Sequence, residues 1–301
     1  MFDCPLLWCP NMEIQKKITM EDDIIPLSIS IPYSNPRHVR TIYSSHHMPH
    51  YEHDNMFSHV SVMFLGGDTN HLFLYGTDGK MYVFEKSGSF VRSFSFQRQG
   101  FNFDSISIDD NYIYSLAFHA LFVGGKDGKR IEKIILTHQT NNLCCICSDH
   151  QYLFVGNQSR VQMLSKSGKM IREFYQTSVT SHIITAHITP HNIAVDENNV
   201  FVSDNRNHCI FVFCKSDGKL LYSIPIAQNI HYLCLFRNEL FVSVEKFEIQ
   251  VFLKSNGDFL RIFKHPKMKQ PYHLYSDETN LFISNIVCRQ KFYGYDVFVF
   301  Q

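Results

Sequence analysis

Short apolar segments rich in Phe, Tyr, Val and Ile recur along the chain, and polar turn-forming residues bound each of them. This length and composition are typical of β-strands, and no sustained apolar stripe with a helical period is present. The aligned segments share one apolar position, occupied by Phe73, Ile113, Phe154, Phe201, Phe241 and Phe282. These positions are separated by 40, 41, 47, 40 and 41 residues, so the chain contains six sequence repeats.

A second landmark follows in five of the repeats, where a turn containing lysine is closed by a glycine. These glycines are Gly88, Gly128, Gly168, Gly218 and Gly257, and another apolar segment follows each of them. Several short strands in a repeat of about 40 residues are typical of a β-propeller, in which each repeat forms one four-stranded blade. The sequence therefore predicts an all-β fold, a six-bladed β-propeller of four-stranded antiparallel blades.

The two ends of the repeat region are predicted to share a blade. The sixth repeat ends at residues 296–301, after its third strand, and residues 37–43 match the fourth strand of the third repeat at 169–175. We expect residues 37–43 to complete the last blade and remove an open sheet edge. Residues 35–301 then form one propeller, and residues 1–34 form a flexible N-terminal arm outside it.

Composition and charge indicate which classes of partner and which cellular compartment to expect for the protein. The 301 residues include 45% hydrophobic and 19% charged residues, with 28 Lys and Arg against 28 Asp and Glu. This balance argues against a protein built to bind nucleic-acid backbone or an anionic membrane. The nine cysteines, without a recognisable secretion signal, are expected to be reduced thiols. A cytoplasmic monomer without membrane contact is the resulting expectation.

The fourth repeat carries the resemblance to a known family. Residues 190–221, PHNIAVDENNVFVSDNRNHCIFVFCKSDGKLL, resemble the NHL repeat in a strand ending in Asp, a strand ending in Ser-Asp, an Asn-containing turn and an Asp-Gly turn. This resemblance implies a platform that binds protein or RNA, often as the tail of a ubiquitin ligase. Some related propellers are metal-dependent lactonases or the lyase of peptide amidation. The cysteine spacings do not match a RING finger, so a ligase role would need a separate catalytic chain.

Five residues are predicted to surround the mouth of the central channel, because they occupy equivalent first-strand positions in repeats two to six: Asp104, Cys144, His191, His231 and Tyr272. The Pro190-His191 pair is similar to the Pro-His pair that supplies zinc ligands in the peptide-amidating lyase. That lyase uses three such histidines, one in each of three alternate blades. At the corresponding positions this chain has His191 together with Asp104 and Tyr272, so the triad of histidines is incomplete. His191, His231 and Asp104 are thus candidate ligands for zinc or calcium. The favoured interpretation is that these side chains line the channel without binding a metal. No cofactor is expected.

Histidines and lysines are also concentrated in the predicted connections between blades. These connections hold 12 of the 17 histidines, His273 among them, and their protonation between roughly pH 7 and 5.5 would charge one face. A basic loop adds Lys264, Lys267 and Lys269 beside Tyr272, an arrangement compatible with phosphate contact and base stacking. No catalytic nucleophile is recognisable. We predict a non-catalytic platform that binds a protein partner through this face, with a metal-dependent enzyme or an RNA-binding platform as alternatives. The predicted binding residues are Asp104, His191, His231, Tyr272 and His273 at the channel mouth and Lys264, Lys267 and Lys269 in the basic loop.

Overall fold

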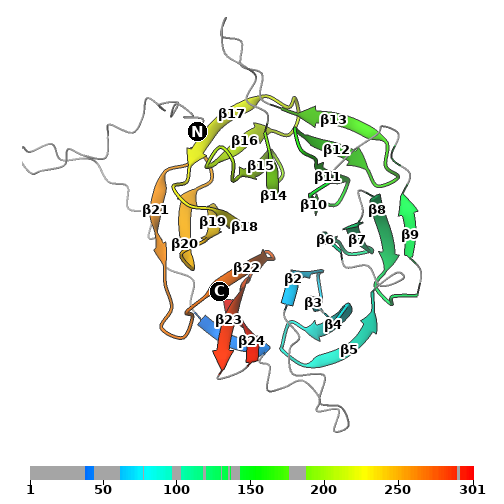
Figure 1. Cartoon of the computed structure of the whole chain (residues 1–301), viewed down its shortest axis with the longest axis vertical. Coiled ribbons are helices and arrows are strands. Elements are labelled where there is room, and N and C mark those ends of the chain that lie inside the picture. The colour runs from blue at the N-terminus through cyan, green and yellow to red at the C-terminus, as the bar shows by residue number, and fades with distance from the viewer. Residues whose placement is uncertain are drawn as a thin grey trace, which may run out of the picture. The chain divides into compact units, whose positions relative to one another are not determined.

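The structure is a computed structural model that describes residues 38–43, 62–76, 78–96, 103–117, 120–129, 131–134, 136, 143–175, 188–289 and 292–301. The described residues contain strands and turns but no helix. Their strands form six antiparallel sheets of four strands each, arranged as blades around a central channel (Figure 1). The predicted six-bladed propeller is confirmed. The predicted N-terminal arm lies outside the described residues.

The first three blades each follow the chain from the innermost to the outermost strand. Blade one consists of β2 (Val62–Gly67), β3 (His71–Gly76), β4 (Lys80–Glu85) and β5 (Phe90–Ser95). Blade two consists of β6 (Ser105–Ile108), β7 (Tyr112–Ala117), β8 (Ala120–Gly125) and β9 (Ile131–Ile134). Blade three consists of β10 (Cys145–Ser148), β11 (Tyr152–Gly156), β12 (Val161–Ser165) and β13 (Met170–Phe174).

Blades four and five repeat this order, and blade six combines both ends of the ring. Blade four consists of β14 (Pro190–Val195), β15 (Asn199–Asp204), β16 (Cys209–Cys214) and β17 (Leu220–Pro225). Blade five consists of β18 (Ile230–Phe236), β19 (Glu239–Val244), β20 (Glu248–Leu253) and β21 (Phe259–Phe263). Blade six consists of β22 (Pro271–Ser276), β23 (Leu281–Arg289), β24 (Phe292–Phe300) and β1 (His38–Tyr43).

The backbone of β1 pairs antiparallel with β24, with His38 opposite Phe300 and Tyr43 opposite Val297. This strand covers nearly the same residues as the predicted 37–43. That the ring depends on β1 for its stability stays a prediction, and a truncation experiment below tests it.

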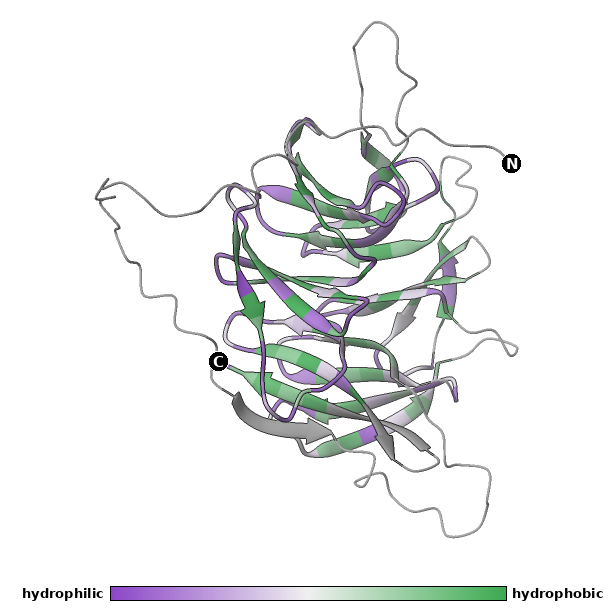
Figure 2. Cartoon of the chain, turned by 60° about the vertical axis from the view of Figure 1, so that its left-hand side comes forward, coloured by the Kyte–Doolittle hydropathy of each residue, from purple (hydrophilic) through white to green (hydrophobic). Residues whose placement is uncertain are grey.

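Apolar packing holds neighbouring blades together. The buried side chains form six clusters, and each cluster joins two adjacent blades. The six aligned repeat positions Phe73, Ile113, Phe154, Phe201, Phe241 and Phe282 are all 0% exposed. In Figure 2 the strands are mostly hydrophobic, and hydrophilic residues gather in the turns. The apolar period in the sequence is thus the period of the core between blades.

The turn glycines take the backbone conformation that the sequence predicts. Gly88, Gly128, Gly168, Gly218 and Gly257 have φ values of 105°, 72°, 87°, 80° and 81°. Positive φ strains residues that carry a Cβ, which explains why each lysine-containing turn is closed by glycine.

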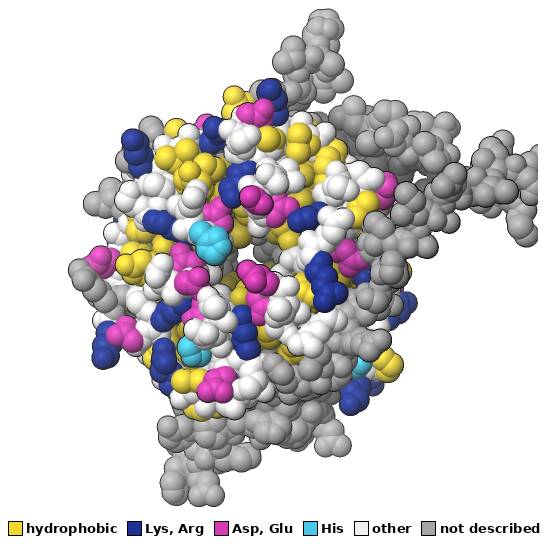
Figure 3. All heavy atoms as spheres, turned by 180° about the vertical axis from the view of Figure 1, so that it is seen from behind, with side chains coloured by type: hydrophobic (Ala, Val, Ile, Leu, Met, Phe, Trp, Pro, Cys, Tyr) yellow, Lys and Arg dark blue, Asp and Glu magenta, His cyan; other side chains and the backbone are white. Residues whose placement is uncertain are grey.

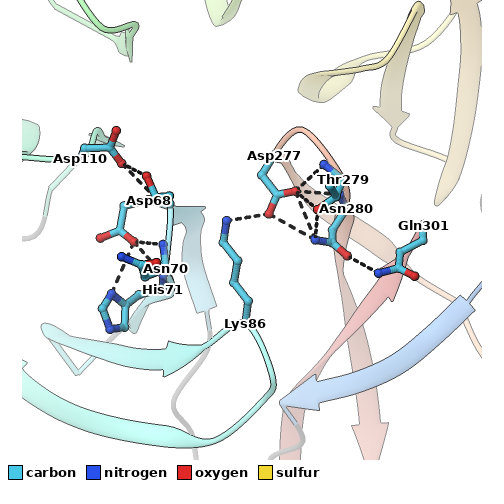
Figure 4. A network of polar contacts seen from close by, with 10 residues as sticks. Asp68, Asn70, His71, Lys86, Asp110, Asp277, Thr279, Asn280 and Gln301 are labelled. Atoms are coloured by element: carbon cyan, nitrogen blue, oxygen red, sulfur yellow. Dashed lines mark hydrogen bonds and ion pairs between the residues drawn. The ribbon is translucent and has the colours of Figure 1, made fainter.

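The lysine of each of these turns forms an ion pair across a blade boundary. It reaches an aspartate in the turn between the first and second strands of the preceding blade; we call this contact a latch. The latches are Lys86–Asp277, Lys126–Asp68, Lys166–Asp109, Lys215–Asp149 and Lys254–Asp196, with N–O distances of 2.5–3.0 Å. Figure 4 shows Lys86 extending from blade one towards Asp277 of blade six. Seen from behind, cationic and anionic side chains lie side by side around the channel opening (Figure 3).

The latches join five of the six blade boundaries. At the boundary between blades five and six, the equivalent turn carries Arg237 and Asn238 in place of aspartate. Burial alone would raise the pKa of Asp68, but hydrogen bonds from Lys126 and two backbone amides lower it below its ordinary value. The carboxylate is therefore more stable as an anion in the folded protein than in the unfolded chain.

Candidate functional site

The inner strands β2, β6, β10, β14, β18 and β22 surround the central channel (Figure 1). Every blade starts with its inner strand, so these strands enter the channel from the same end. We call this end the channel mouth and define it by the residues Met63, Asp104, Cys144, His191, His231 and Tyr272. These residues line a cavity of about 370 Å³ together with the rest of the inner strands. The sequence-predicted residues of the mouth are therefore brought together. That volume lies within the range of small-ligand sites.

An irregularity in the inner strand occurs at the channel mouth in four of the blades. The register of the strand pair shifts at Met63, at His191, at His231 and across Tyr272 and His273. A β-bulge leaves one residue unpaired and changes the direction of its side chain. The fold thus presents different side chains from equivalent positions around one opening.

Buried serines on the second strands support three of these bulges. Ser203, Ser243 and Ser284 are 0% exposed, and each Oγ accepts a hydrogen bond from a backbone amide of the inner strand. The amides belong to Asn192, Tyr232 and His273, at distances of 2.9, 3.1 and 2.9 Å. The hydroxyl satisfies a donor that the irregular ladder would otherwise leave unpaired. The serine also recurs at this position in blade two, as Ser115, where the described inner strand has no register shift, so the serine alone does not predict a bulge.

His191 and His231 lie on neighbouring blades, and the electrostatic interaction between them affects the pKa of His231. His191 is exposed to the channel, and desolvation by the surrounding protein lowers the pKa of its imidazole. Desolvation also lowers the pKa of His231, and the neighbouring His191 lowers it further. Both rings therefore become charged at a lower pH than an ordinary histidine. The predicted protonation window of pH 7 to 5.5 moves downward at this site.

Aromatic rings form a cluster on the side of the mouth made by blades five and six. The ring of Tyr272 lies 4.7 Å from that of His231 and 5.6 Å from that of Tyr232, measured between centroids. Tyr232 also packs 4.4 Å from His273. Such clusters provide large rigid contact surfaces with polar edges, which suits recognition of a partner side chain.

His273 does not belong to the exposed surface, contrary to the expectation for a binding residue. It is 1% exposed, and it lies within β22 and not in a connecting loop. Its Nδ1 is 3.1 Å from Ser284 Oγ, and its Nε2 is 2.9 Å from the Met63 carbonyl oxygen of blade one. Burial lowers its pKa to about 3. His273 is thus a neutral residue that joins blades six and one.

Asp104 and Cys144 complete the mouth at blades two and three, where each precedes its inner strand. Asp104 is exposed, and its backbone amide donates to the Leu116 carbonyl oxygen at 2.8 Å. The Cys144 thiol donates to the Pro190 carbonyl oxygen of blade four at 3.0 Å. Within the described ranges, no group of three or more His, Cys, Asp and Glu residues is placed to hold a metal ion. The candidate ligands His191, His231 and Asp104 thus do not form such a group.

The histidines and lysines predicted to lie in the connections between blades have different locations in the structure. His191 and His231 belong to inner strands and not to the loops between blades, because β14 and β18 begin one residue earlier. Most of the remaining clustered histidines lie outside the described residues. Lys264, Lys267 and Lys269 are exposed on the connection between β21 and β22, and Lys264 Nζ is 3.8 Å from Glu248.

Asp204 and Asn207 cap the turn that follows β15. The Asn207 amide donates to Asp204 Oδ1 at 2.9 Å, and Thr189 N donates to Oδ2 of the same carboxylate at 2.7 Å. Asp204 is 0% exposed, so its oxygens serve these internal donors.

Comparison with known sequences identifies one repeat. The NHL repeat family matches residues 189–213, which run from the start of β14 into β16. The chain fits an NHL-repeat β-propeller. A propeller of this kind supports a binding or scaffold role in general. A search of curated proteins gives no match to this NHL-repeat propeller.

Solved structures with the same architecture are distant in sequence. The computationally designed Ika8 protein is 14% identical with a TM-score of 0.51, covering 75% of this chain and 68% of its own. A protein of unknown function from Bacteroides caccae is 13% identical with a TM-score of 0.53, covering 74% and 85%. At these identities the likeness concerns the fold of the NHL-repeat propeller alone. In the described part of the chain, no helix is long and apolar enough to cross a membrane.

Proposed function

We propose that the protein is a non-catalytic, cytoplasmic platform that recognises a protein partner at the channel mouth. The observation that carries the proposal is the set of bulged inner strands, which present His191, His231 and Tyr272 at one opening. Serine hydrogen bonds and packing between blades fix this surface before binding. Preorganisation reduces the entropy lost on association and so favours recognition.

The aromatic side of the mouth suits a partner side chain with apolar and polar parts. Tyrosines with packed rings contribute large contact areas at low conformational cost, and such residues are enriched among the strongest contributors to protein interfaces. The resemblance to NHL propellers supports the further proposal that the platform recognises substrates for a ubiquitin ligase carried by another chain.

Site-specific photo-crosslinking tests the proposed surface. A photo-crosslinking amino acid at His191 should capture a partner in lysate of cells that express the protein. The matched control is the same group at Glu197, which is exposed in the turn at the other end of β14. The captured partner, once purified, should bind the His191→Ala, Tyr272→Ala double variant about tenfold more weakly than wild type. Equal capture from Glu197, or unchanged affinity of the double variant, would contradict the proposal.

Metal analysis separates this function from that of a metal-dependent enzyme. Purified protein should contain no stoichiometric zinc or calcium. A metal content near one ion per chain that is lost in the His191→Gln, His231→Gln variant would overturn the non-catalytic assignment, because neutral imidazole is a common metal ligand.

A further inference from the structure

A second recess lies beside the channel mouth, between the β19–β20 turn and the β21–β22 connection. We call it the basic groove and define it by Lys246, Phe247, Glu248, Lys264, His265, Pro266 and Met268. Phe263 and Pro271 also line the groove, and its volume is about 570 Å³. Pro271 directly precedes Tyr272, so the groove adjoins the proposed binding surface.

The β19–β20 turn holds an aromatic ring in an exposed and strained position. Phe247 is 41% exposed and has a φ of 56°, in the left-handed region that bulky residues rarely occupy. Its amide donates to the Val244 carbonyl oxygen at 2.9 Å, which fixes the turn. Glycine would relieve the strain, so the phenyl ring occupies this position at a cost in stability.

The opposite wall is a preformed loop. Buried Asn285 accepts hydrogen bonds from the amides of Lys269 and Gln270 at 2.8 and 2.7 Å, and the Met268 amide donates to the His265 carbonyl oxygen at 2.9 Å. These bonds hold the apolar side chains of Pro266 and Met268 towards the groove. Little ordering entropy then remains to be lost on binding.

The rim of the groove is rich in positive charge. Lys246 and Lys264 line the groove from its two sides, Lys267 and Lys269 belong to the same connection as Lys264, and all four are exposed. Glu248 lies 3.8 Å from Lys264, and Glu245 accepts a hydrogen bond from Asn229. The groove lining thus carries two lysines and one carboxylate, and two further exposed lysines follow Lys264 on the β21–β22 connection. A ligand that brings its own carboxylates would complement this rim.

We propose that the basic groove binds an extended acidic segment of a partner protein, with one apolar side chain seated between Phe247 and Met268. This inference rests on the proposed function as a protein-binding platform and specifies the chemistry of the partner. A peptide is favoured over RNA because Pro266, Met268 and Pro271, which line the groove, offer no aromatic ring on which a base could stack. Phe247 is the one exposed aromatic ring among the residues that line the groove, whereas single-stranded RNA requires successive stacking surfaces.

Fluorescence anisotropy with synthetic ligands tests the groove independently of any natural partner. The probe is a short labelled peptide in which glutamates flank a single leucine. Its counterparts are the same peptide with lysines in place of glutamates and a labelled oligouridine. The acidic peptide should bind more tightly than both, and added salt should weaken its binding because exposed charges are screened.

Two groove variants and two controls locate the binding. Phe247→Gly suits the positive φ and should weaken binding of the acidic peptide about tenfold. Lys246→Glu with Lys264→Glu should weaken it by at least about tenfold. Phe259→Ala and Lys219→Glu remove an exposed ring and an exposed charge outside the groove, and should leave affinity within about twofold of wild type. Equal melting temperatures establish that the variants remain folded.

Three outcomes would overturn the inference. The acidic peptide would bind no better than its lysine counterpart, its binding would survive both groove variants, or oligouridine would bind more tightly with the same dependence on Phe247 and Lys264. None of these outcomes affects crosslinking from His191, so failure of the groove and failure of the channel-mouth platform are distinguishable.

Discussion

Lys166 of blade three places its Nζ 2.7 Å from Asp109 Oδ2 of blade two. The same ammonium donates to the Asp149 carbonyl oxygen at 2.7 Å and lies 4.7 Å from the centre of the Tyr114 ring. The Lys166 ammonium therefore contacts polar groups of blades two and three. The side chain of Lys166 is 26% exposed and that of Asp109 is 12% exposed. Latches of this kind connect most of the ring.

Replacing the lysine of a latch should destabilise the fold. Lys166→Met keeps the apolar stem but leaves the Asp109 carboxylate partly buried without its cation, at an expected cost of about 1–3 kcal/mol in unfolding free energy. Urea denaturation measures this change. The matched control is Lys129→Met, because Lys129 and Asp127 are 4.0 Å apart and their side chains are 85% and 56% exposed. Equal effects of the two substitutions would show that the latch contributes nothing.

The buried serines provide a paired test of the bulges. Ser243 accepts a hydrogen bond from Tyr232 N and donates one to the Tyr272 carbonyl oxygen at 2.6 Å, so it joins blades five and six. Ser243→Ala should reduce the unfolding free energy by about 1–3 kcal/mol, because both partners lose a hydrogen bond.

Ser115 occupies the equivalent position in blade two and is the control for this experiment. It is also 0% exposed, but its Oγ has no hydrogen-bond partner in the described part of the chain. Ser115→Ala should therefore have a clearly smaller effect in the same urea denaturation assay. If both alanine variants lose equal stability, the hydrogen bonds of Ser243 do not hold the bulge.

His273 should make stability depend on pH. Its imidazole stays neutral in the folded protein down to a pKa of about 3, whereas the unfolded chain binds the proton near the ordinary value of 6.5. The unfolded state therefore binds more protons between these values, and stability decreases as pH falls from 6.5 towards 3.

The expected change in unfolding free energy follows from the extra proton that the unfolded chain binds at His273. Between pH 7 and 5, His273 should contribute a loss of about 2 kcal/mol in unfolding free energy. His273→Gln retains polar atoms but does not titrate, so its stability should change less between urea denaturation at pH 7 and at pH 5. An unchanged pH dependence in this variant would show that the buried neutral imidazole is not the cause.

Removal of β1 should damage the ring. Deletion of residues 1–34 leaves the pairing of β1 with β24 intact, whereas deletion of residues 1–43 exposes the edge of β24. The longer truncation should aggregate or melt at a markedly lower temperature, because an unpaired strand edge recruits other chains. Size-exclusion chromatography and thermal unfolding distinguish the two forms. If both truncations match the full chain, β1 is not required for closure.

The architecture could be predicted because it depends on periodic burial. Each repeat places an apolar residue at the same position, and a sheet buried on both faces needs such a residue in every blade. Phe73 and Phe282 belong to repeats at opposite ends of the chain, yet both are completely buried between neighbouring blades. The turn glycines were predictable because the backbone of each turn has a positive φ, which glycine adopts without strain.

The candidate site was only partly predictable. Alignment of the repeats brought His191, His231 and Tyr272 to the channel mouth, because repeat position determines location in a ring. His273, one residue further along, looked equally available in the sequence. The bulge in β22 spans both residues, and it leaves Tyr272 at the mouth while His273 is buried against Ser284 and Met63.

The sequence by itself determined the strands, the number of blades and the position of each residue within its repeat, since these follow from local propensity and a regular apolar period. Tertiary structure decided the direction and environment of individual side chains. The latch from Lys166 to Asp109 and the depressed pKa of His273 both depend on groups from neighbouring blades, and the latch partners are 57 residues apart. Such contacts form only when the ring closes, because electrostatic and hydrogen-bond energies depend on distances that a linear pattern does not contain.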